Sequence, residues 1–157
     1  MADPAPIDFA DWHAIFDLSV QYAQHIDTRN WDAFVECFAP RVHVDFSSFT
    51  RHPAPTEPIA ITDWLAAVRS TIDGFAATQH LIGNQRIVLE SPTEARYSAY
   101  VQAQHWMDPQ RWYLVGGWYD NRVTRIDGAW RISTLKLNQL WDNGDRGLLR
   151  EVNRRTT

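Results

Sequence analysis

Apolar residues recur at helical spacing through the N-terminal half of the chain. In FADWHAIFDLSVQYAQHID, positions 9–27, apolar side chains follow one another at steps of three and four residues, which indicates an amphipathic helix. Asn30 is expected to cap a second helix, in which WDAFVECF repeats the helical spacing until Pro40 ends it. A third helix, ITDWLAAVRSTI, is expected from about Thr62 to a point near Gly74. The pattern therefore predicts three helices in this half.

The pattern then changes to extended segments. Before the third helix, VHVDFSSF alternates in part and predicts a strand, and RHPAPTEP predicts a loop because its three prolines lack the N–H that a sheet needs. From Gln85 onward come four segments rich in strand-forming residues, RIVLE, ARYSAYVQAQHWM, WYLVGGWYDNRVTRI and AWRISTLKLNQLW. Turn signals separate them at 91–92, 108–109 and 127–128. Gly116-Gly117 lies inside one segment and would permit the bend of a curved sheet.

Helices followed by long strands favour an α+β fold, in which three N-terminal helices pack on a strongly curved, mainly antiparallel sheet. The 157 residues fit one domain over 1–157, with a core from about 8 to 142. The polar tail, 143–157, is expected either to fray or to cover the open end of the sheet. Trp112, Trp118 and Trp130 are expected on the outer face of the sheet, where they would form a large apolar patch. We therefore expect a homo-oligomer, either a dimer or a trimer.

Composition and charge narrow the range of partners. Aromatic residues make up 13% of the chain, with eight Trp, which suits either an aromatic core or an enclosed apolar ligand. The net charge of -4 and the lack of a basic block beyond Arg154-Arg155 argue against nucleic acid and anionic membranes. The start of the chain has no signal-peptide pattern, and no apolar run approaches the ~20 residues that a bilayer requires. With Cys37 as the single cysteine, expected in the core, we predict a cytoplasmic protein.

Two polar residues fall where the pattern predicts a buried environment. Asp27 ends the first helix, and His80 follows the third helix in ATQHLIGNQ, at a junction that can direct a side chain between helices and sheet. If the two meet, the carboxylate orients the imidazole and makes His80 a positioned general base. The alternative for Asp27 is a structural role as the cap of the second helix.

A second imidazole ends a row of mostly small side chains. Strand alternation places Tyr97, Ala99, Val101, Ala103 and His105 on one face, where small residues leave room for a ligand. His105 is then either a ligand contact or a histidine satisfied within the core. The sequence contains no metal-binding motif, phosphate loop or dinucleotide fingerprint, so we expect no metal and no organic cofactor.

The order of IDTRNWDAFVECFAPRVHVDF, TQHLIGN and GAWRISTLKLNQLW resembles the nuclear transport factor 2-like superfamily. Within it, the chain is most similar to the SnoaL-like branch that includes scytalone dehydratase, over nearly its whole length. The resemblance implies a cone-like fold in which Asp27 orients His80, with His105 in the place of a second histidine on a following strand. Ile26 and Phe46 stand where scytalone dehydratase is expected to carry tyrosines, so scytalone itself is not the expected substrate.

Tyr22 lies about one helical turn before Asp27 and resembles the tyrosine that accompanies the Asp-His pair in bacterial bile-acid dehydratases. It could supply the missing phenol. The expected catalytic residues are therefore Asp27, His80, His105 and Tyr22. The expected substrate-binding residues are the aromatic side chains Phe46, Trp118, Tyr119 and Trp141.

Together these features predict a cofactor-independent lyase, a dehydratase that eliminates water from a small hydroxylated aromatic or polycyclic substrate. Isomerisation, polyketide cyclisation or formaldehyde-releasing retro-aldol cleavage are alternatives, since each begins with proton abstraction on the same scaffold. The non-catalytic alternative is a ligand-binding or assembly subunit, such as the small subunit of a ring-hydroxylating dioxygenase. Such a subunit would not need Asp27 and His80 in contact.

Overall fold

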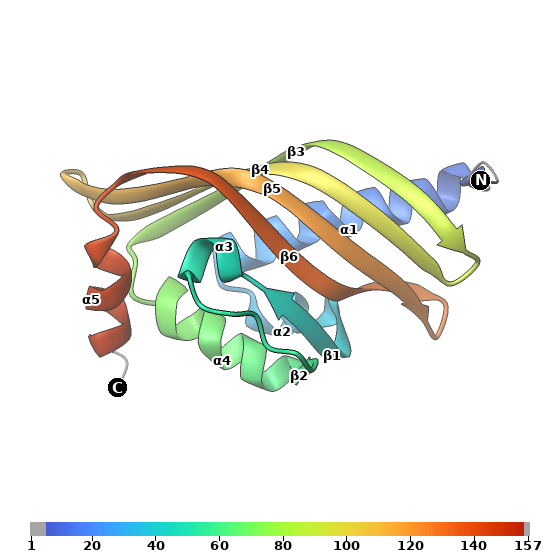
Figure 1. Cartoon of the computed structure of the whole chain (residues 1–157), viewed down its shortest axis with the longest axis horizontal. Coiled ribbons are helices and arrows are strands. Elements are labelled where there is room, and N and C mark those ends of the chain that lie inside the picture. The colour runs from blue at the N-terminus through green and yellow to red at the C-terminus, as the bar shows by residue number, and fades with distance from the viewer. Residues whose placement is uncertain (1–5, 156–157) are drawn as a thin grey trace.

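A computed structural model describes residues 6–155 (Figure 1). The N-terminal half contains α1 (Phe9–Thr28), α2 (Trp31–Glu36), β1 (Phe38–Asp45), α3 (Ser47–Thr50), β2 (Ile59–Ala60) and α4 (Ile61–Ile72). The C-terminal half contains β3 (Ala77–Ser91), β4 (Glu94–Asp108), β5 (Arg111–Ile126), β6 (Ala129–Gly144) and α5 (Gly147–Arg155). Helices thus precede the long strands, as the sequence predicts.

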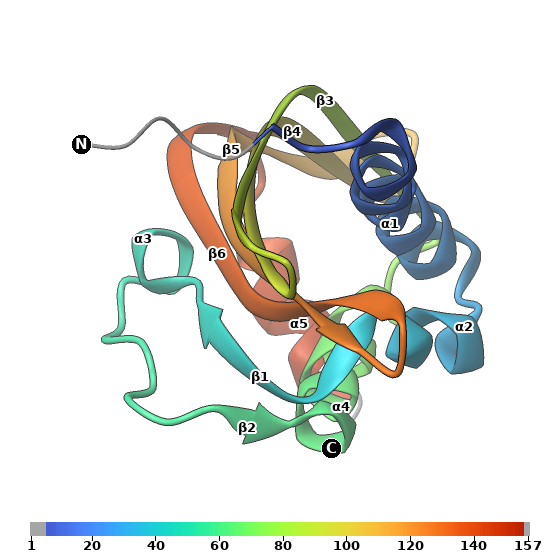
Figure 2. The ribbon, with the colours of Figure 1, turned by 90° about the vertical axis from the view of Figure 1, so that its right-hand side faces the viewer.

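The six strands form one sheet in the order β2-β1-β6-β5-β4-β3. Neighbouring strands are antiparallel, except that β1 and β6 run parallel. The sheet curves strongly, and α1 and α4 lie on its concave side (Figure 2). This arrangement confirms the predicted α+β fold with N-terminal helices on a curved, mainly antiparallel sheet. No helix within residues 6–155 is long and apolar enough to cross a membrane.

The concave face of the sheet forms the core together with the helices. The predicted row on β4 is confirmed, because every member from Tyr97 to His105 at alternate positions is buried. Cys37 is also buried, as expected, and burial raises the pKa of its thiol to about 12. Near the C-terminus, Leu148 and Val152 of α5 pack against Phe75, so this part of the tail is packed onto the domain.

Two expectations about where strands end and begin were wrong. The segment VHVDFSSF does not continue as a strand to its end, because Asp45 accepts hydrogen bonds from the backbone N–H and the hydroxyl of Ser47 and the chain turns into α3. In addition, β3 begins at Ala77, so His80 lies within a strand rather than at the junction before it. The strand is longer than its apolar pattern suggested because Thr78 and His80 face the helices with polar groups that are paired there.

Trp130 was expected on the outer face of the sheet but is 5% exposed and packs in the core. The pairing of β5 with β6 shifts between Arg122 and Val123, where Thr134 and Ile132 are the partners, leaving Ser133 as an extra residue. Such a bulge reverses which face the following alternate residues occupy, and it turns Trp130 inward, where its indole N–H donates to Asp11.

The outer face still carries exposed large apolar residues. They are Leu81, Tyr100, Trp106, Leu140 and Trp141. The homo-oligomer expected from the sequence stays a prediction on this basis.

Candidate active site

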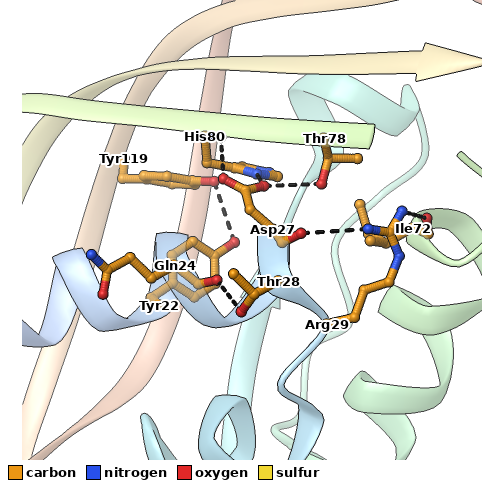
Figure 3. A network of polar contacts seen from close by, with 9 residues as sticks. All are labelled: Tyr22, Gln24, Asp27, Thr28, Arg29, Ile72, Thr78, His80 and Tyr119. Atoms are coloured by element: carbon orange, nitrogen blue, oxygen red, sulfur yellow. Dashed lines mark hydrogen bonds and ion pairs between the residues drawn. The ribbon is translucent and has the colours of Figure 1, made fainter. Parts of the chain in front are cut away.

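Asp27 lies in the last turn of α1, and its side chain is not used as a helix cap. The helix ends because Arg29 adopts a left-handed conformation, with φ 57°, and its N–H closes the last turn. Asn30 caps α2 by accepting a hydrogen bond from the backbone N–H of Ala33 at 3.4 Å. The capping alternative for Asp27 is therefore wrong, and its carboxylate instead points to β3 (Figure 3).

Asp27 and His80 form a close pair. The Oδ1 atom of Asp27 lies 2.7 Å from Nδ1 of His80, and its Oδ2 atom accepts the backbone N–H of His80 at 2.7 Å. The hydroxyl of Thr78 donates to the same Oδ1 atom at 2.9 Å. These contacts hold the carboxylate in one orientation against β3, and they direct the remaining imidazole nitrogen, Nε2, away from Asp27 (Figure 3).

The surroundings of Asp27 favour its ionised form. Burial alone would raise the pKa of this carboxyl group, but the hydrogen bonds and charge of His80 and the hydroxyl of Thr78 more than offset that effect and lower the pKa. The side chain of Asp27 is 18% exposed and that of His80 is 6% exposed. An ionised carboxylate so placed would stabilise the imidazolium formed when His80 accepts a proton.

His105 lies next to this pair. The register of β3 and β4 pairs Thr78 with His105 and His80 with Ala103, so both imidazoles occupy the same face, with ring centroids 5.9 Å apart. Burial, followed by the charge of His80, lowers the pKa of His105 to about 3. His105 is therefore a neutral imidazole near pH 7, suited to hydrogen bonding rather than to donating a proton from a charged ring.

Two buried tyrosines complete the polar part of the site. The hydroxyls of Tyr22 and Tyr119 lie 3.4 Å apart, and the ring of Tyr22 meets that of His80 edge to face, with centroids 6.4 Å apart. Burial raises the pKa of Tyr119 to about 12 and raises that of Tyr22 well above its ordinary value. Both phenols stay protonated, and when one hydroxyl donates to the other, the second is free to donate a hydrogen bond to another oxygen.

These residues line a cavity of about 220 Å³ between the helices and the sheet. Its wall is otherwise mostly apolar, with contributions from α1, α3, α4, α5 and the sheet. Of the residues expected in the site, those that line the cavity are Tyr22, Phe46, His80, His105 and Tyr119. Asp27 contacts the cavity through His80. The structure therefore brings together all four residues that the sequence marks as catalytic.

Trp118 and Trp141, which the sequence analysis includes among the substrate-binding residues, do not line this cavity. Trp118 neighbours the inward Tyr119 on a strand and so must point to the other face, where it lines a shallow hollow. Trp141 is turned outward by a second bulge, since Gly117 pairs with Gln139 and Gly116 pairs with Trp141, leaving Leu140 extra. Only the structure reveals that second reversal.

Sequence reasoning missed other residues of the site. Thr78 stands two positions before His80, and strand alternation would have placed both on one face had the strand been predicted to begin at Ala77. Phe49 and Trp64 line the cavity from α3 and α4, and no sequence signal separates them from ordinary core aromatics. Within residues 6–155, no group of three or more His, Cys, Asp or Glu is placed to hold a metal ion.

The curved sheet and its covering helices define a cone-like α+β domain, in which a carboxylate–imidazole pair lies beside an internal cavity. Residues 8–136 match the SnoaL-like domain, so the chain belongs to the SnoaL-like family. This confirms the resemblance to that branch of the nuclear transport factor 2-like superfamily.

Three similar proteins illustrate the family. Dehydratase cfoI of Aspergillus candidus is 25% identical over 155 residues, which cover 90% of each chain. Scytalone dehydratase of Colletotrichum orbiculare is 26% identical over 158 residues, covering 92% of this chain and 82% of the relative. The crystal structure of Kfla4162 from Kribbella flavida has a TM-score of 0.83 and 28% identity, covering 90% of this chain and 97% of that one. Two of these relatives, each about a quarter identical to this chain, thus carry the names of lyase-type enzymes.

Proposed function

We propose that this protein is a cofactor-independent dehydratase that uses Asp27 and His80 to eliminate water from a small hydroxylated aromatic or related ring compound. The observation that carries the proposal is the 2.7 Å contact between Asp27 Oδ1 and His80 Nδ1 at the wall of an apolar cavity. A purely structural or ligand-binding subunit has no need of an oriented imidazole there. The dehydratase names of two relatives support the same reaction class.

In the proposed reaction, Nε2 of His80 removes a proton from a carbon next to a carbonyl group. The electron pair of that C–H bond becomes the second bond of a C=C, and the C–O bond to the hydroxyl group on the neighbouring carbon breaks. His80 then returns the proton to the departing oxygen, so the products are water and the unsaturated ketone. Asp27 stabilises the positive charge that His80 carries between the two proton transfers.

His105, Tyr22 and Tyr119 would act on oxygens. Neutral His105 uses its ring N–H on the backbone of Tyr113, so its unpaired Nδ1 can accept a hydrogen bond from a substrate hydroxyl. Both phenols keep their protons, and when one hydroxyl donates to the other, the second can donate a hydrogen bond to the substrate carbonyl or to the leaving hydroxyl. Such donors stabilise the enolate that develops as His80 takes the proton. In this proposal His80 is the base, and the other three groups act through hydrogen bonds.

The cavity limits the size of the substrate. An apolar protein cavity of ~150 Å³ accommodates benzene, so one of about 220 Å³ suits a substituted single ring or two fused rings. Larger polycyclic compounds would require the cavity to open.

The test is a screen of one- and two-ring hydroxylated ketones against the native protein, Asp27→Asn and His80→Ala, with water loss followed by ultraviolet absorbance. We expect turnover by the native protein and a loss of ~10²–10⁴-fold in each variant. His52→Gln, at an exposed site, is the matched control and should retain activity. Equal turnover by all four proteins would refute the proposed pair.

A further inference from the structure

Trp64 presents an unsatisfied hydrogen-bond donor in the cavity wall. Within residues 6–155, five buried side-chain polar atoms have no partner, among them Nε1 of Trp64 and Nδ1 of His105. Both residues line the cavity. An indole N–H is a donor only, and it usually finds an acceptor when it is buried. Leaving such a donor unpaired is unfavourable, so an unpaired one beside a cavity calls for an acceptor within that cavity.

Trp64 is fixed in place by its neighbours. It lies in the first turn of α4, on the helix face that also gives Ala67, Val68 and Thr71 to the cavity. The ring of Phe46 meets its indole edge to face, with centroids 5.4 Å apart. The donor is therefore held on the α4 side of the cavity, whereas His80 and His105 enter from the sheet.

We propose that Trp64 is a substrate-binding residue whose Nε1–H donates a hydrogen bond to an acceptor oxygen of a one- or two-ring substrate. This inference rests on the proposed function for the choice of ligand. It adds that an acceptor oxygen of the substrate, such as the carbonyl oxygen that the proposed reaction requires, faces α4, and that Trp64 selects for that oxygen. A site that binds an oxygen through a buried donor discriminates against the analogue without that oxygen, because the donor then stays unpaired.

The experiment compares two ligands of one ring system, 1-tetralone and tetralin, which differ in the carbonyl oxygen. Binding is followed by ¹H–¹⁵N correlation spectra of the tryptophan indoles, with the Trp64 resonance assigned from Trp64→Phe. We expect 1-tetralone, and not tetralin, to move the Trp64 indole proton downfield. We also expect Trp64→Phe to weaken 1-tetralone binding by ~3–10-fold relative to tetralin. Trp12→Phe, on α1 and outside the cavity wall, is the matched control and should change neither affinity.

Three results would overturn the inference: an unmoved Trp64 indole proton, an equal loss of affinity for both ligands, or no binding of either ligand. None of these measurements needs turnover, so they are independent of the proposed reaction. If Asp27→Asn and His80→Ala keep full activity while the Trp64 effect is present, the proposed acid-base pair fails and the role of Trp64 stands.

Discussion

The neutral, buried His105 should make the stability of this protein depend on pH in a defined window. His105 is 6% exposed, and its pKa falls from an ordinary value near 6.5 to about 3 in the folded chain. Below pH 6.5 the unfolded chain therefore binds a proton that the folded chain does not. Its contribution to stability is complete above pH 6.5 and is lost as the pH falls toward 3, because protonation favours the unfolded chain.

The size of the effect follows from the two pKa values. Each pH unit between them costs about 1.4 kcal/mol, so lowering the pH from 7.5 to 5.0 should remove about 2 kcal/mol of unfolding free energy through His105. Asp27 does not interfere in this window. Its pKa is lowered from 3.8, so its stabilising contribution is complete above that value and is lost only as the pH falls through the lower, folded-state pKa.

The assay is urea denaturation followed by tryptophan fluorescence at pH 7.5 and 5.0, for the native protein and His105→Gln. The native protein should lose about 2 kcal/mol more than the variant between the two pH values, with an unchanged urea dependence. Histidines that do not contact His105 have the same surroundings in both proteins, so their effects cancel in the difference. His52→Gln, at an exposed site, should behave like the native protein. An equal pH dependence in the native protein and His105→Gln would refute a depressed pKa at His105.

Two further predictions concern the support of the active site and the bend of the sheet. Thr78→Val removes the hydroxyl that donates to Asp27 Oδ1 and should lower kcat by ~10-fold in the dehydration assay. Thr78→Ser keeps a hydroxyl and should retain most of the native kcat. Equal rates for the two variants would exclude a role for that hydrogen bond. Gly117→Ala should destabilise the protein by ~1–3 kcal/mol in urea denaturation, because its new Cβ would lie 2.1 Å from the backbone oxygen of Asn138. Gly83→Ala is the matched control, since a Cβ there meets nothing within 4 Å, and comparable losses in both variants would contradict this reasoning.

Much of the fold can be predicted from the local pattern of the chain. The helical spacing around Ile15 and Tyr22 predicts α1, and the three turn signals fall between the strands that they were expected to separate. Alternation on β4 correctly places His105 and its row on the buried face. These features are local because helix and strand periods are set by the backbone of neighbouring residues.

The residues of the candidate site were predicted only in part, and with the help of family resemblance. Spacing alone left Asp27 as either a helix cap or a partner of His80, and the placement of Asn30 and His80 in space decided between them. The contact joins residues 53 positions apart, which no local pattern can fix. Thr78 became visible only with the true start of β3.

By itself, the sequence determined α1, α2, α4 and most of the long strands, because those elements depend on neighbours along the chain, whereas α3 and α5 were not predicted. The tertiary structure decided the properties that depend on residues far apart in the chain. Two bulges on β6 turn Trp130 inward and Trp141 outward, since one extra residue in a strand reverses the faces that follow it. Burial together with the charge of His80 keeps His105 neutral, and packing leaves the indole of Trp64 without a partner. Those long-range effects give the cavity its chemistry.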